Sequence, residues 1–235
     1  MLIRVRRAAG GRPLLPAPSF VVSAVVVIVV LSVLVVVQAR MRCDPRLSTC
    51  DPLVENALRT AGWVAAHPAI FRAATEGATR FPLTLAGFGC ALAFAVLRRP
   101  RGAVLSLIGP WAAVALDDRI AKRIFGGSFP SGRAAALFAL ASVVVLLVAT
   151  TPLTSRPLRW TFRAVLAISI AVAWTMSSAV IATGTHPPVD VVGGACFGVV
   201  VVLIAALLID AAARPLARGP RPTPSPRRPL DQAIT

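Results

Sequence analysis

The sequence predicts an all-α, polytopic membrane protein, and three observations point to this class. Of its 235 residues, 57% are hydrophobic and only 14% are charged, whereas a water-soluble domain has about a quarter of its residues charged. The mean hydropathy is +0.78. Apolar stretches of about fifteen to twenty residues alternate with short Arg-rich connections, as in a helical bundle that crosses a bilayer. A soluble enzyme is therefore excluded. The net charge of +16 does not indicate nucleic-acid binding, because the basic residues lie between the apolar stretches.

Six apolar stretches are predicted to be membrane-spanning helices, because a span must satisfy its backbone hydrogen bonds internally. Two of them are shorter than the ~20 residues needed to cross about 30 Å of hydrocarbon, and Pro110 interrupts the second of these, so a five-span bundle is the alternative. The six ranges are 20–39, 81–97, 103–116, 134–153, 162–183 and 190–210.

The first stretch, 20–39, has a second interpretation as a cleavable signal peptide. Met1–Arg7 is basic, and Val37-Gln38-Ala39 resembles a cleavage site. The apolar run is longer than the roughly 7–15 residues of a signal peptide, which favours an uncleaved helix. Either interpretation leaves the sidedness of the other spans unchanged.

The distribution of charge predicts how the chain is oriented. With a cytosolic N-terminus, the inner segments and span ends hold fifteen Arg and two acidic residues, and the outer side holds nine Arg, one Lys and seven acidic residues. By the positive-inside rule, both termini are cytosolic in the plasma (inner) membrane. The chain then divides into a basic N-terminus (1–19), a transmembrane domain (20–210) and a disordered Pro/Arg-rich cytosolic tail (211–235) attracted to anionic lipids.

Three segments then lie on the extracytoplasmic side: 40–80, 117–133 and 184–189. The first is predicted to form amphipathic helices at the membrane surface, with a solvated loop as the alternative. In an oxidising compartment Cys43 and Cys50 either form a disulfide across a small loop or remain free thiols. No Cys/His cluster has the spacing of metal ligands, so no metal and no cofactor are expected.

The second outer segment, 117–133, contains Lys122, the only Lys in the chain, and ends with Phe129-Pro130-Ser131-Gly132 and Arg133. Ser131 is a good N-cap for the helix that follows. Free N–H groups at a helix start attract phosphate, and Lys122, Arg123 and Arg133 add positive charge. The alternative is a Gly/Pro-rich turn with interfacial cations.

The third outer segment carries His186 and Asp190, four residues apart at the start of the last span. In a helical turn they share a face, so Asp190 can fix the imidazole tautomer and leave the other ring nitrogen free to attack an electrophile. The alternative is an interfacial His without catalytic function.

Together these two segments resemble the type 2 phosphatidic acid phosphatase (PAP2) superfamily, a family of six-helix membrane proteins with the motifs KxxxxxxRP, PSGH and SRxxxxxHxxxD. The resemblance covers about residues 81–210 and implies a metal-independent phosphatase. It implies that His186 is the nucleophile that forms a phosphohistidine, that Asp190 orients it, and that Lys122 and the backbone around Ser131 and Gly132 bind phosphate.

The sequence also departs from the family pattern. Arg133 replaces the general-acid His, Ala179-Val180 replaces Ser-Arg, and Phe129 stands where the first motif has its Arg. Arginine stays protonated and is a poor proton donor. We therefore consider His67, the only other His, as a candidate acid brought to the site by the outer segment.

Two functions follow from this pattern. The first is a phosphatase acting on the outer face on a lipid phosphate or diphosphate, either polyprenyl or phospholipid, whose tail stays among the membrane lipids. The alternative is a PAP2-like pseudoenzyme that binds a lipid phosphate or a membrane partner without turnover. A transporter is disfavoured, because the span interiors contain almost no ionisable residues. The sequence identifies no protein partner and no nucleic-acid partner.

Overall fold

The computed structural model describes residues 14–15, 22, 26, 29–30, 33, 50–77, 79–125, 129–150 and 156–217, and every regular element among them is a helix. The predicted all-α class is therefore confirmed. Most of 20–39, Cys43 and the tail beyond Ala217 lie outside the described residues. The uncleaved first span, the Cys43–Cys50 disulfide and the disordered tail consequently stay predictions.

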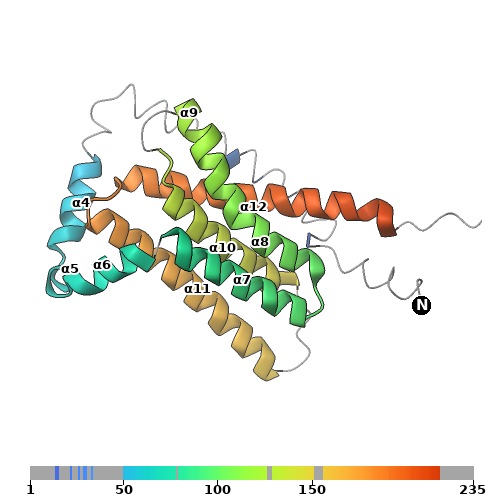
Figure 1. Ribbon diagram of the computed structural model, residues 1–235. Helices are drawn as coiled ribbons and strands as arrows, with labels where there is room; N and C mark the ends of the chain where they lie inside the picture. Colours follow the sequence, from blue (N-terminus) through green and yellow to red (C-terminus); the bar gives the residue numbers. More distant parts are fainter. Residues whose placement is uncertain are drawn as a thin grey trace, which may run out of the picture.

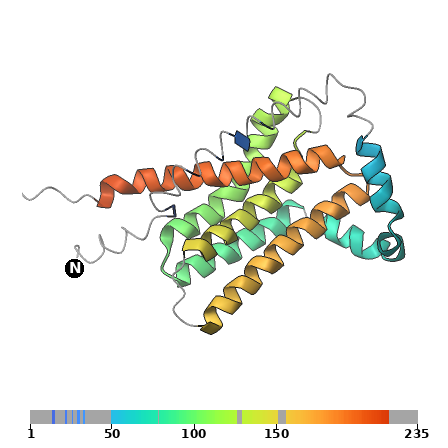
Figure 2. The same ribbon diagram turned by 180° about the vertical axis from the view of Figure 1, so that it is seen from behind.

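Long helices pack side by side in one bundle (Figure 1; from behind in Figure 2). The central helix is α10, because it packs against each of the other four. The five long helices in the described part of the chain are α7 (Arg80–Val96), α8 (Pro100–Leu116), α10 (Gly132–Thr150), α11 (Arg156–Ala182) and α12 (Pro188–Ala217).

Several of these helices have the length and surface of membrane spans. Segments Gly132–Thr150, Arg159–Ala182 and Pro188–Ala213 are each long and apolar enough to cross a membrane, and α6 and α7, bent by 61°, make a fourth if counted together. Large apolar side chains such as Leu92 and Ile168 are exposed on the bundle, at 67% and 62%, as expected for surface that faces lipid. Helices α7 and α8 have only 17 residues each, so the six-span count stays a prediction.

Helix α8 continues beyond the predicted end of its span at residue 116. It runs into a π-helical turn, η1 (Asp117–Ala121), and a last helical turn, α9 (Lys122–Phe125), so the outer segment 117–133 begins as helix. Pro110 is buried inside α8 and does not end it. Spanning helices tolerate proline because neighbouring groups can satisfy the backbone carbonyl that it leaves without a donor.

Short helices cover one end of the bundle (Figure 1). They are α4 (Cys50–Thr60), α5 (Gly62–Ala66) and α6 (Pro68–Gly77). Val64 and Phe71 pack against Ala179 and Ala182 of α11, which attaches these helices to the bundle. The helices predicted for the outer segment are thus present, and their position at a membrane surface stays a prediction.

The opposite end of the bundle is held by a buried carboxylate. Asp210 of α12 is 2% exposed, accepts hydrogen bonds from the backbone N–H groups of Leu14 (3.0 Å) and Leu15 (2.8 Å), and pairs with Arg101 of α8 (3.2 Å). Residues 14–15 and the C-terminal part of α12 therefore lie at the same end, away from His186.

Candidate functional site

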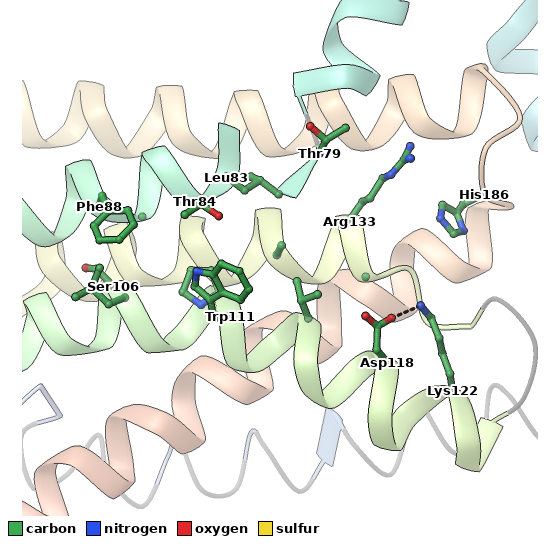
Figure 3. Close-up of a pocket in the computed structure, with 16 residues that line it drawn as sticks. Thr79, Leu83, Thr84, Phe88, Ser106, Trp111, Asp118, Lys122, Arg133 and His186 are labelled. Carbon is green, nitrogen blue, oxygen red and sulfur yellow. Dashed lines mark hydrogen bonds and ion pairs between the residues drawn. The ribbon is translucent and has the colours of Figure 1, made fainter. Parts of the chain in front are cut away.

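A cavity of about 320 Å³ lies between α7 and α8 and reaches the N-terminus of α10 and the loop that precedes α12. Its two ends differ in chemistry (Figure 3). Apolar side chains such as Phe88 and Trp111 line the part between α7 and α8, while charged and polar side chains surround the other end. The polar end contains Lys122, Asp118, Arg133 and His186.

Glycines in α12 allow the two polar segments of the sequence to meet. A Cβ atom on Gly194 would collide with the carbonyl oxygen of Ser131, and one on Gly198 would collide with that of Ala135. Without these side chains, the start of α10 lies directly on α12. The Ser131 N–H then donates a hydrogen bond to the Asp190 carbonyl at 2.8 Å, which ties the two segments together.

His186 lies in a tight loop just before α12. Gly184 adopts a φ of +68°, and the Thr185 N–H donates to the carbonyl of Val180, so the chain turns sharply out of α11. Nδ1 of His186 is 3.7 Å from Oδ2 of Asp190, which is longer than a hydrogen bond of about 2.7–3.2 Å. Helix α12 begins at Pro188, so His186 lies just before the helix and Asp190 lies in its first turn. The two side chains approach each other, but they do not belong to one complete helical turn.

Lys122 is held by two carboxylates that the sequence analysis did not assign to the site. Its Nζ lies 2.6 Å from Oδ1 of Asp118, as a hydrogen bond, and 3.2 Å from Oδ2 of Asp117, as an ion pair. The backbone N–H of Lys122 donates a hydrogen bond to the backbone carbonyl of Asp117, five residues earlier. This π-helical spacing puts residues five apart on one face, so both carboxylates reach the same ammonium group.

Burial sets the charge behaviour of this group. Asp117 is 0% exposed, and burial raises its pKa above the usual range, although the positive charge of Lys122 acts in the opposite direction. Burial lowers the pKa of Lys122, but the hydrogen bond to Asp118 and the charge of Asp117 outweigh it and raise that pKa overall. Lys122 is therefore a cation at neutral pH, and the pKa of Asp117 lies above that of an ordinary aspartate.

The first turn of α10 supplies further polar groups. Gly132 and Arg133 line the cavity, and Ser131 is fully buried, with its Oγ lacking a hydrogen-bond partner in the described part of the chain. The first N–H groups of a helix have no acceptor within it. A Cβ on Gly132 would lie 2.7 Å from Oδ2 of Asp117, so only glycine lets this turn approach the buried carboxylate.

Other predicted residues do not reach the cavity. His67 and Arg123 are exposed, and neither belongs to the residues that line it. Their roles as acid and phosphate ligand stay predictions. Phe129, Ala179 and Val180, which replace charged or polar residues of the family pattern, are buried at 4%, 0% and 1%. No group of three or more His, Cys, Asp or Glu in the described residues could hold a metal ion.

Comparisons with known proteins assign the chain to a family. No curated protein and no solved structure matched it. The family model described as the PAP2 superfamily matches residues 80–214, which is more than half of the sequence. The match includes the start of α10, the His186 loop and all the residues that line the cavity except Thr79. The chain therefore belongs to the PAP2 superfamily.

Proposed function

We propose that the protein hydrolyses the phosphate or diphosphate group of a membrane lipid at His186. One observation carries the proposal: a single cavity has cations and a histidine at one end and an apolar lining at the other. An amphiphile has the same two-part character. A phosphate head would lie between Lys122 and Arg133, and the first part of the lipid tail would lie along Phe88 and Trp111.

The chemistry assigned to His186 is nucleophilic attack on phosphorus. Its Nδ1 is buried and faces Asp190, so Nε2 is the nitrogen that would attack. The new N–P bond forms as the bond from phosphorus to the leaving oxygen breaks, and water then hydrolyses the phosphohistidine. The 3.7 Å separation from Asp190 would shorten to a hydrogen bond when substrate fills the cavity, since such bonds are often long in empty sites.

The departures from the family motifs restrict the substrate. Arg133 can stabilise negative charge but cannot serve as an effective acid, and loss of general-acid help costs typically 10²–10⁴-fold. A substrate whose leaving group needs no added proton avoids this cost. A lipid diphosphate, which releases a phosphate monoester, therefore fits better than a simple monophosphate, which releases an alcohol.

The site is proposed to face the extracytoplasmic side. The charge distribution along the sequence supports this orientation, and so does the anchoring of Leu14 and Leu15 on Asp210 at the end opposite His186. Cysteine labelling from either side of sealed vesicles tests it. A cysteine introduced at exposed Glu76 should react with an impermeant reagent from outside, and labelling from the cytosolic side alone would contradict the orientation.

The decisive experiment measures phosphate release by the full chain in lipid nanodiscs. Substrates are polyprenyl diphosphate, polyprenyl phosphate, phosphatidate and phosphatidylglycerophosphate. His186→Ala should abolish release, and wild type should prefer the diphosphate. His67→Ala runs in parallel: unchanged activity would exclude His67 as the acid, and a loss of about 100-fold or more would support it. Release that survives His186→Ala would refute the proposed nucleophile.

A binding protein without turnover is the second candidate. The observation that favours it is the pairing of Lys122 with both Asp117 and Asp118, which neutralises the principal cation of the empty site. In that case wild type and His186→Ala should bind lipid phosphate equally, with no phosphate released from any substrate.

A further inference from the structure

Among the described residues, cations and carboxylates lie close together at the polar end of the cavity. Asp118, Lys122, Arg133 and His186 line this end, and Oδ2 of Asp117 lies 3.2 Å from Nζ of Lys122. An anion that binds Lys122 has to compete with the two carboxylates that already hold it, in a partly buried place where water screens charge poorly. Loss of Lys122 would leave the buried Asp117 carboxylate without this counterion, which is costly unless the acid takes up a proton.

Of the two carboxylates that hold Lys122, Asp117 is the one best placed to take up a proton. It is fully buried, and its Oδ2 lies 3.2 Å from the ammonium nitrogen of Lys122. Asp118 is 37% exposed and accepts a 2.6 Å hydrogen bond from Lys122, which favours its charged form. Burial already raises the pKa of Asp117, and a nearby anion would raise it further.

The surroundings of Asp117 contain few other charges. Lys122 and Asp118 face it from its own helical extension, and His186 faces it from the loop before α12. Arg133 lies on the first turn of α10, across the cavity end. Helix α8 carries no ionisable residue after Arg101. Among the described residues, Lys122 is the group that opposes protonation of Asp117 most strongly, and a positive charge on His186 would act in the same direction.

We propose that Asp117 is a positioning residue of the anion site: as a carboxylate it holds Lys122 in the empty cavity, and on anion entry it takes up one proton and releases the ammonium group to the ligand. This inference rests on the proposed anion site but not on turnover. Because binding and protonation are linked, the anion binds more tightly at low pH. Above the pKa of Asp117 in the empty site, affinity should fall by up to about tenfold per pH unit.

The test is calorimetric titration of the full chain in nanodiscs with octyl sulfate, whose own charge is constant between about pH 5 and pH 8. Titrations in buffers of different ionisation heat give the number of protons taken up. We expect uptake that approaches one proton above the pKa of Asp117. Inorganic sulfate has the headgroup without the tail, so it should bind more weakly but with the same proton uptake, because the protonation accompanies headgroup binding. Proton uptake near zero across this range in wild type would overturn the proposal without any variant.

Two substitutions separate Asp117 from its neighbour. Asp117→Asn imitates the protonated acid, so binding should persist, become independent of pH and lose the proton uptake. Asp118→Asn removes a negative charge and should tighten binding at every pH while the pH dependence remains. Loss of binding in folded Asp117→Asn, or persistence of its proton uptake, contradicts the assignment. Failure of His186-dependent phosphate release would instead count only against the proposed enzyme, because these titrations need no reaction.

Discussion

Replacing Gly194 by Ala tests whether the site depends on the close approach of α10 to α12. The added methyl group would lie 3.0 Å from Cβ of Ala134 and still closer to the carbonyl oxygen of Ser131. Carbon atoms in contact are about 3.5–4.0 Å apart. The two helices therefore have to separate by roughly 0.5–1 Å to accept one methyl group.

That separation acts on the site directly, because Ser131 immediately precedes the first turn of α10 and is hydrogen-bonded to Asp190. A displacement of about 1 Å in a reacting geometry costs about 100-fold in rate. Overpacking of a core costs about 1–3 kcal/mol of stability, which a folded bundle can tolerate. We therefore expect Gly194→Ala to fold and to lose about 100-fold in phosphate release.

The matched control is Gly89→Ala in α7. A Cβ at Gly89 would have no atom within 4 Å, and alanine is favoured over glycine in a helix by about 1 kcal/mol. This variant should keep wild-type activity and unfold at the same or a higher temperature. The assay is phosphate release in nanodiscs, together with thermal unfolding, or octyl sulfate affinity if there is no turnover. Folded Gly194→Ala with activity within about twofold of Gly89→Ala would refute the reasoning.

Three further predictions concern other parts of the chain. Arg133→His should raise phosphate release by at least about tenfold, because an imidazole that lines the cavity can donate a proton. An unchanged rate in the folded variant would contradict the idea that the lack of an acid at position 133 limits the reaction. Val180→Arg should unfold the bundle rather than restore a family arginine, because Val180 is 1% exposed in the core, as thermal unfolding would reveal. Asp210→Ala should cost about 3 kcal/mol or more, since the buried N–H groups of Leu14 and Leu15 lose their acceptor at about 1–3 kcal/mol each; an unchanged unfolding temperature would contradict this.

The parts of the fold that could be predicted from the sequence depend on local composition. A helix in a bilayer needs only a continuous apolar run, so α10 and α12 were located to within a few residues at their N-terminal ends. Both ends of α12 extend beyond the predicted 190–210, because small residues such as Ala211 continue the helix after the apolar run ends. Helix boundaries depend on the cap and the following loop, which hydropathy does not describe.

The carboxylates of the site were missed because they depend on a backbone register. Asp117 and Asp118 were counted as acidic residues of an outer loop, and their spacing from Lys122 acquires meaning only when α8 continues through a π-helical turn. The spacing of five and four residues was the available signal. The exposure of His67 similarly depends on where α5 ends and α6 begins, and the sequence pattern of the outer segment does not specify that junction.

The replaced family positions and the carboxylates beside Lys122 act in the same direction: both reduce the positive charge that the site offers to an anion. Where the family pattern has arginines, Phe129 packs against Gly193 and Val180 packs in the core, so neither position can supply positive charge to the cavity. Among the described residues, Lys122 and Arg133 are the Lys and Arg side chains that line the polar end, and Asp117 and Asp118 already hold Lys122. A phosphatase with a full set of arginines could bind a dianion at any pH near neutral, but this site has to release Lys122 from its carboxylates first. Coupling ligand entry to protonation of a buried acid achieves this release, because burial raises the pKa of Asp117 and so lowers the cost of its neutral form.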